Sequence, residues 1–248
     1  MRSNINSFLT GENSNAKYFL KKIPNEKNFI NLILKQYQSF IDSFTSDVPE
    51  SKLVELNLFW ITNRGFCIAI ELLLQGHISE AYAIVSKSAE ASGYALKIHN
   101  SPEKAEVWVK KGDLDKKDFS DQFGEPFQRD MYVEFPQLKL LYQIYELTRE
   151  YGTHSNLASV IFHVERNIQD NGKTHYRFKT SELENPKLVQ ANINYIIHSY
   201  LLMLNIFNIC FSQIINKRWS RKLSQLDSLF DNYRPSTPDM LNALGFVK

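Results

Sequence analysis

Apolar side chains recur along most of this chain at the three- and four-residue spacing of one helical face. The pattern predicts long helices over about 28–44, 51–75, 79–98, 136–152 and 185–219. Gly76 ends the second of these helices, and the short connection to the third predicts two antiparallel neighbours. Shorter helices are predicted from Pro102 and after Trp219, so the chain is mainly helical.

The predicted helix over 79–98 is rich in small residues, so another backbone can approach it closely. These residues are Ala81, Ala83, Ser88, Ala89, Ala91, Ser92, Gly93 and Ala95.

Two β-prone runs, 160–168 and 173–179, flank Asn171-Gly172. Asn-Gly between such runs is a strong signal for a β-hairpin. The predicted fold class is therefore mainly α, a helical bundle with a small β-hairpin insertion at about 160–179. We expect one domain over 1–248, with a loosely attached N-terminal arm (1–27) and a short C-terminal tail (233–248).

The middle of the predicted helix over 185–219 is hydrophobic enough to raise the question of a membrane span. Its polar residues share one helical stripe, which favours a buried helix of a soluble protein. They are Asn194, His198, Asn205, Asn208 and Ser212. Such a stripe either lines an internal polar cavity or faces water, and facing water is the commoner arrangement.

The composition fits this picture, because 43% hydrophobic and 23% charged residues are typical of a soluble globular protein. A net charge of +2 is too small to indicate a nucleic-acid binder by itself. Cys67 and Cys210 lie in apolar runs and are interpreted as small buried residues. The first residues lack a continuous apolar run, so we expect no signal peptide and a cytoplasmic protein that does not enter a membrane.

Two stretches resemble families of bacterial helical proteins that are mostly uncharacterised. In 72–111 the resemblance rests on Gly76, Glu80-Ala81, Lys87, Glu90, Pro102-Glu103 and Trp108, and in 141–156 on Tyr145, Thr148 and His154. The family more often has Arg at the position of Lys87. Together the two stretches cover about a quarter of the chain, and the resemblance implies a helical fold.

Arg149 and His154, separated by four residues, resemble the signature of the HEPN superfamily. Its members are helical bundles, commonly dimeric, and include metal-independent ribonucleases of toxin–antitoxin and phage-defence systems. Active members usually have Asn, Asp or His directly after the Arg, whereas this chain has Glu150. The resemblance implies RNA as substrate, a second copy as partner, and a protein partner such as an antitoxin.

RNA cleavage by its own 2′-hydroxyl needs a proton acceptor and donor near pH 7 and a cation for the charge on phosphate. His154 would act as general acid and base, and Arg149 would bind the phosphate. Tyr151, Glu90 and Lys87 would support them. The alternative for Arg149 is an ordinary cation at a helix end, and for Lys87 and Glu90 a solvated helix face.

A basic cluster, Lys217, Arg218, Arg221 and Lys222, surrounds Trp219. Basic side chains beside an aromatic ring are typical of nucleic-acid surfaces. Cations that end the long helix over 185–219 explain the cluster equally well, and this interpretation is favoured.

No His or Cys spacing suits a metal, and the chain has no phosphate-binding Gly loop and no G-x-S-x-G motif. We therefore expect no metal and no cofactor. The leading hypothesis is an HEPN-like endoribonuclease of toxin or phage-defence type. The alternative is a non-catalytic helical module that binds a protein partner or dimerises, so whether the chain is an enzyme stays open.

Overall fold

A computed structural model describes residues 5–127, 131–152, 164–168, 174–178 and 186–234. The long helices are α1 (Ile5–Lys22), α2 (Pro24–Gln38), α3 (Leu53–Gln75), α4 (Ile78–Asn100), α8 (Gln137–Gly152), α10 (Pro186–Cys210) and α11 (Lys217–Tyr233). The short helices are α5 (Lys104–Val109), α6 (Lys116–Phe123) and α7 (Met131–Glu134), with single 3-10 turns η1 (Ile41–Ser43), η2 (Glu50–Lys52) and η3 (Lys110–Gly112).

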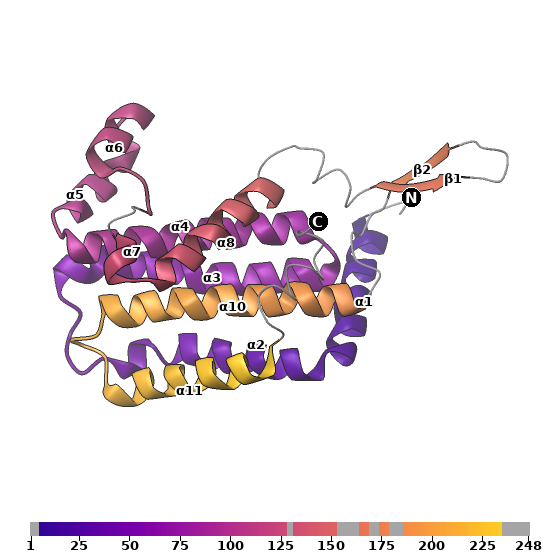
Figure 1. Cartoon of the computed structure of the whole chain (residues 1–248), viewed down its shortest axis with the longest axis horizontal. Helices are drawn as coiled ribbons and strands as arrows, with labels where there is room; N and C mark the ends of the chain where they lie inside the picture. Colours follow the sequence, from indigo (N-terminus) through magenta and orange to yellow (C-terminus); the bar gives the residue numbers. More distant parts are fainter. Residues whose placement is uncertain (1–4, 128–130, 153–163, 169–173, 179–185, 235–248) are drawn as a thin grey trace.

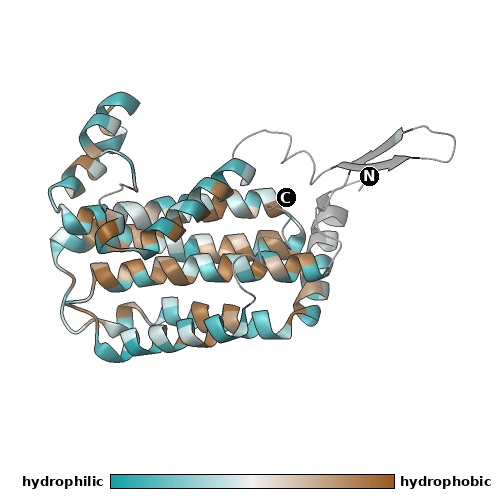
Figure 2. Cartoon of the chain, viewed as in Figure 1, coloured by the Kyte–Doolittle hydropathy of each residue, from teal (hydrophilic) through white to brown (hydrophobic). Residues whose placement is uncertain are grey.

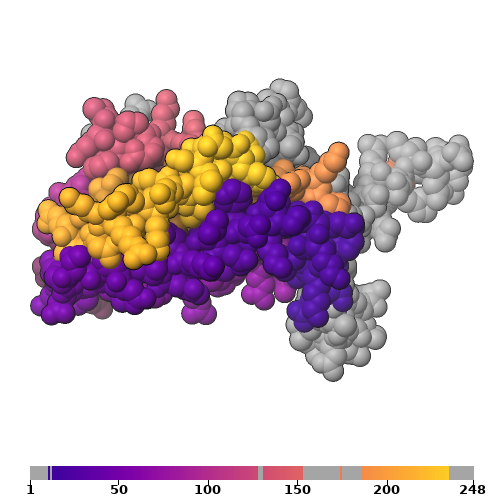
Figure 3. Space-filling model, turned by 90° about the horizontal axis from the view of Figure 1, so that it is seen from below, coloured from indigo at the N-terminus to yellow at the C-terminus, as the bar shows by residue number. Residues whose placement is uncertain are grey.

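Three long helices, α3, α4 and α10, pack against one another in the middle of the bundle (Figure 1). Helix α8 covers α4 on one side, whereas α2 and α11 pack on α10 on the other side. Figure 3 shows α11 in yellow lying along the N-terminal helices on the lower face of the molecule. Helices α3 and α10 are brown along much of their length in Figure 2, while α11 is mostly teal, as expected for core and covering helices.

The α3–α4 pair forms as the sequence predicts. Gly76 ends α3 in the left-handed conformation, with φ of 98°, which a residue without a Cβ adopts at little cost. Farther along the pair, an ideal Cβ on Gly65 would lie 2.1 Å from the Ser88 Oγ. The Ser88 hydroxyl is 2.8 Å from the hydroxyl of Tyr200 on α10. A glycine on α3 thus lets the three central helices meet around one hydrogen bond.

Aromatic rings join the central layer to α2 and α11. The Phe40 ring stacks on Phe59 with ring centroids 3.9 Å apart and meets Trp219 at 5.2 Å. The Trp219 indole N–H donates to the Gln36 carbonyl at 3.0 Å. Trp219 is therefore a core residue that fixes the start of α11 on α2.

The helix predicted over 185–219 is wrong in its extent. Helix α10 ends at Cys210, a short turn follows, and α11 begins at Lys217. Asn216 caps α11, because its side chain accepts a hydrogen bond from the Trp219 backbone N–H at 2.9 Å. The apolar residues of the turn, Phe211 and Ile215, are buried, so the hydrophobic pattern continues through the break and conceals it.

The polar stripe of α10 does not face water, because α11 and α2 cover it. Asn194 and His198 are buried. Asn205 donates to Asp227 of α11 at 2.8 Å, and Asn208 accepts from the Ser220 hydroxyl at 2.7 Å. Within α10 the stripe thus faces neighbouring helices, with part-buried hydrogen bonds from Asn205 and Asn208 to α11, whereas Ser212 lies beyond the end of α10 and is exposed.

The N-terminal arm also differs from the expectation. Residues 5–22 form the continuous helix α1, and the side chains of Phe19 and Ile23 are buried in the core. Only residues 1–4 of the predicted arm, and residues 235–248 of the predicted tail, lie outside the described residues.

The predicted fold class needs a correction at the β-hairpin. The bundle is helical throughout its described residues, and no β-hairpin is built into it. Within the described part of the chain, two five-residue strands, β1 (Val164–Ile168) and β2 (Thr174–Phe178), pair with each other in antiparallel register, with Val164 opposite Phe178. They lie beside the bundle in Figure 1 and form no layer of it. The predicted turn at 169–173 lies outside the described residues.

Two helical segments, Glu50–Gln75 and Pro186–Cys210, are long and apolar enough to cross a membrane by length and composition. The core helix of a soluble protein meets the same criteria, and 78% of the apolar window of α10 is buried, against 44% for α3. A cytoplasmic location without membrane contact stays a prediction.

Two titratable groups, buried His198 of α10 and half-buried Asp227 of α11, predict opposing pH effects on stability. Burial lowers the pKa of His198 to about 4, and it raises the pKa of Asp227 to about 6. Between pH 4 and 6.5, His198 is protonated in the unfolded chain and neutral in the folded chain. Between pH 3.8 and 6, Asp227 is protonated in the folded chain and ionised in the unfolded chain. The His198 contribution is therefore lost as pH falls below 6.5, and the Asp227 contribution is lost as pH rises from about 4 to 6.

We expect the urea concentration at the midpoint of unfolding, measured at several pH values between 4 and 6.5, to reveal the contributions of His198 and Asp227 separately. In His198→Gln only the Asp227 contribution remains, so stability should fall with rising pH relative to wild type. In Asp227→Asn only the His198 contribution remains, so stability should rise with pH relative to wild type. Variants that both keep the wild-type slope would contradict this assignment.

Candidate functional site

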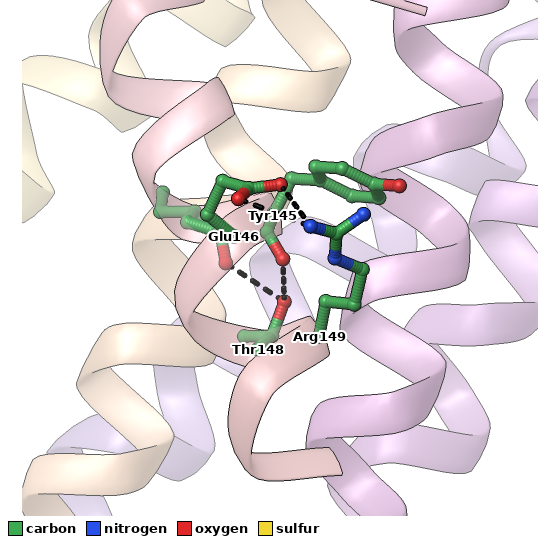
Figure 4. A network of polar contacts seen from close by, with 5 residues as sticks. Tyr145, Glu146, Thr148 and Arg149 are labelled. Carbon is green, nitrogen blue, oxygen red and sulfur yellow. Dashed lines mark hydrogen bonds and ion pairs between the residues drawn. The ribbon is translucent and has the colours of Figure 1, made fainter. Parts of the chain in front are cut away.

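Helix α8 carries the residues on which the sequence-based hypothesis rests. It packs on α4 through one face, because Leu138, Leu141, Ile144 and Thr148 recur at helical spacing and are all buried. The Thr148 hydroxyl donates to the Ile144 carbonyl one turn back, at 2.7 Å. Its hydrogen bond is thus satisfied within its own helix (Figure 4).

The end of α8 contacts the backbone of α4 directly. An ideal Cβ on Gly152 would lie 2.3 Å from the Ala83 backbone nitrogen and 2.8 Å from its Cα. No larger residue fits there without a shift of the backbone. The small residues of α4 permit this close approach, as the sequence predicts.

Arg149 lies in the last turn of α8, with 44% of its side chain exposed. Its Nη2 is 3.0 Å from one carboxylate oxygen of Glu146 and 3.1 Å from the other. Its guanidinium carbon is 5.3 Å from the centre of the Tyr145 ring (Figure 4). Partial burial opposes the charged form, but Glu146 and Tyr145 outweigh it and raise the pKa of Arg149. The guanidinium is a fixed cation whose charge is already paired.

Beside this pair lies a cleft of about 390 Å³ between α8 and the segment that leads into α7. Its lining residues are Glu125, Pro126, Phe127, Tyr132, Tyr142, Tyr145, Glu146 and Arg149. Four of these are aromatic, and the Phe127 ring lies 5.9 Å from Tyr142 and 5.5 Å from Tyr145. The volume is within the usual range for a small-ligand site, about 300–1,000 Å³.

The back of the cleft is held against α4. Lys97 is buried, its ammonium donates to the Glu125 carbonyl at 2.9 Å, and it lies 5.4 Å from the centre of the Phe123 ring. At Gly93, an ideal Cβ would approach the Phe127 ring and the Pro126 carbonyl to 3.0 Å. A small residue and a buried cation on α4 thus position the segment that carries Phe127.

Acidic groups outnumber cations around the cleft. Glu146 neutralises Arg149, whereas the exposed Glu125 side chain has no ion pair with another described residue. Glu90 of α4 is half-buried and lies close enough to raise the pKa of Tyr94 and of Tyr145, for both of which burial is the larger cause. The cleft is therefore aromatic and carries net negative charge.

The predicted site residues only partly converge. Glu90 is half-buried and close enough to Tyr145 of α8 to raise its pKa, but Lys87 is exposed and lines a groove between α3 and α4 instead. Tyr151 is half-buried at the end of α8. His154 lies outside the described residues, so its distance from Arg149 stays untested.

The basic cluster does not lie at the end of a long helix, contrary to the interpretation favoured from the sequence. Its cations do not end a helix, because Lys217, Arg218, Arg221 and Lys222 occupy the first turns of α11, where the helix dipole opposes positive charge. All four side chains are exposed, and none pairs with a carboxylate in the described part of the chain. Trp219 is buried and cannot stack on a base. The cluster thus offers charge alone.

Sequence reasoning missed the cleft, because its rings come from two parts of the chain that meet only in the folded structure. Phe127 and Tyr132 lie in a charged connector, residues 112–134, whose sequence shows little helical periodicity, and Tyr142 is on the face of α8 away from α4. Tyr142 and Tyr145 are three residues apart and so share a face, which is the one signal that the sequence contains.

No protein-family model, no curated protein and no solved structure was found to match this chain.

The Gly152 contact predicts that Gly152→Ala will destabilise the protein. The added methyl group would displace the end of α8 from α4, and overpacking of this kind costs about 1–3 kcal/mol. Gly112→Ala is the matched control, because an ideal Cβ there meets no atom within 4 Å. We expect thermal unfolding at a lower temperature for the first variant and an unchanged temperature for the second. Equal unfolding temperatures would show that α8 does not depend on this contact.

Proposed function

We propose that this protein is a non-catalytic helical binding module that recognises an organic cation, an alkylammonium or guanidinium group, in the cleft beside Arg149. The observation that carries the proposal is the meeting in one cleft of four aromatic rings with the Glu125 carboxylate, which forms no ion pair with the described part of the chain. Aromatic faces attract cations because the ring quadrupole is negative on its faces. A carboxylate beside the rings adds direct charge attraction.

The protein already contains one contact of this kind. The Arg149 guanidinium lies over Tyr145 and binds Glu146, so these three residues satisfy one another. Tyr142 is 37% exposed and Glu125 is exposed, and both remain available to an incoming group. A lysine or arginine side chain of a partner protein carries the group that this site would bind.

Phosphate is a poorer fit to the same site. Among the described residues that line the cleft, Arg149 is the one cation, and Glu146 binds it with both oxygens. Glu125 and the exposed Glu150 would repel a phosphate nearby. A polyanion would have to displace Glu146 and approach two further carboxylates.

Calorimetric titration with a short oligo-arginine peptide, and separately with the tetramethylammonium ion, tests the proposal. We expect Tyr142→Ala to weaken binding about 3- to 30-fold, as loss of one cation–π contact implies. Glu125→Gln should weaken it as well, and more so at low salt. Tyr18→Ala is the matched control, because Tyr18 is 50% exposed on α1, outside the cleft, and its loss should leave affinity unchanged.

Two results would overturn the proposal. One is binding of neither cation. The other is binding of single-stranded RNA that depends on Arg149 while the cationic peptide does not bind.

RNA cleavage by an HEPN-like mechanism is the second candidate. The observation in its favour is the position of Arg149 in the exposed last turn of α8, a few residues before His154. In this proposal Arg149 exchanges Glu146 for a phosphate, and His154 moves the proton of the 2′-hydroxyl. An antitoxin or another copy of the chain would be the partner that the resemblance implies.

This second candidate predicts that the purified protein degrades single-stranded RNA in the presence of EDTA. His154→Ala and Arg149→Ala should each abolish cleavage without unfolding, as followed by circular dichroism. Lys139→Ala removes an exposed cation from the first turn of α8 and should leave cleavage intact. Intact RNA after incubation with folded wild-type protein would exclude this mechanism.

A further inference from the structure

Helix α3 exposes an apolar strip, although it is apolar on most of its surface and such helices are normally buried. Leu53 is 50% exposed and Trp60 44% exposed, and Cys67 follows at the same seven-residue interval. Ile61 and Ile68 form a half-buried row directly beside them. No other described helix covers this strip.

Charged side chains on the same face are arranged symmetrically. Arg64 and Glu71 are exposed on α3, seven residues and about 10 Å apart, with Cys67 between them. Glu80 and Lys87 are exposed on α4 at the same separation, with Ile84 between them.

A groove of about 290 Å³ between the two helices brings the cations together. Arg64 and Lys87 both line it, along with Ile61, Ile68 and Ile84. Because α3 and α4 are antiparallel around Gly76, Glu71 and Glu80 lie together at the end of the face nearer that turn. The α3–α4 face therefore has a cationic end, an apolar middle and an anionic end.

We propose that the α3–α4 face is the interface between two copies of this chain, related by a two-fold axis that crosses α3 beside Cys67. This axis runs perpendicular to the helices and makes the paired α3 helices antiparallel. Arg64 then meets Glu71 of the partner subunit, and Lys87 meets Glu80 of the partner subunit. An isologous interface repeats each contact, so each of the two kinds of ion pair occurs twice across the interface.

Charge complementarity favours a second copy of the chain in this antiparallel arrangement over other arrangements and other partners. The opposite choice, with the axis parallel to the helices, would place Arg64 against Lys87 of the partner subunit and is repulsive. A membrane surface suits the apolar strip less well, because Arg64, Glu71 and Asn57 would enter the acyl region unpaired. The interface uses α3 and α4 rather than the aromatic cleft, so it does not depend on the proposed function.

Charge reversal tests the proposal by analytical ultracentrifugation over a range of protein concentrations. We expect wild type to dimerise and Arg64→Glu to raise the dimer dissociation constant about tenfold or more, because the new carboxylate would face Glu71 of the partner subunit. Adding Glu71→Arg to that variant should restore the dimer. Wild type that stays monomeric, or a double variant as weak as the single one, would overturn the proposal.

Crosslinking provides a second readout with the same protein. A short bis-maleimide should join two copies through Cys67, which is exposed and lies near the axis, whereas Cys210 is buried. Cys210→Ser should leave the crosslinked dimer intact, and Cys67→Ser should remove it. No crosslink in a folded dimeric preparation, or wild-type binding to neutral phosphatidylcholine vesicles through Trp60, would refute this interface.

Discussion

The structure depends on the contact at which Gly65 of α3, Ser88 of α4 and Tyr200 of α10 meet. A side chain at Gly65 would occupy the position of the Ser88 hydroxyl, and that hydroxyl is the one the buried Tyr200 needs. Burial of an unpaired hydroxyl is costly, so the three helices must approach closely or leave it unsatisfied. This contact fixes α4 at the centre of the bundle, and the surfaces on either side of α4 are built from that position.

Helix α4 supports two surfaces of different character. Glu90 lies close enough to Tyr145 to raise its pKa and adds negative charge near the cleft, while Lys87, one turn earlier, lines the groove with Arg64 of α3. The same small residues let α8 and the segment at Phe127 approach α4, since Gly93 and Ala83 leave room for their atoms. Close packing around one helix therefore determines both which side chains stay exposed and which of them become neighbours.

The sequence predicts the parts of this fold that local signals govern. Gly76 marks the end of α3 through its left-handed conformation, and the apolar spacing over 136–152 predicts the helix that forms α8. The break between α10 and α11 is invisible because Phe211 and Ile215 continue the apolar pattern through it. The cleft escapes prediction for another reason: Phe127, Tyr132 and Tyr142 come together through tertiary packing, and the connector that supplies two of them has no periodicity.

Charge is also distributed in a way that composition conceals. The net charge of +2 suggests a neutral surface, yet the cleft on α8 is negative and the first turns of α11 hold four exposed cations. These regions lie on opposite sides of the central layer (Figure 1). The cations oppose both the dipole of α11 and one another, which is an arrangement that an anionic partner would relieve. Because Trp219 is buried, that attraction would be electrostatic without stacking, and so would weaken with salt. One near-neutral chain thus carries a negative surface and a positive surface on opposite sides of its central layer.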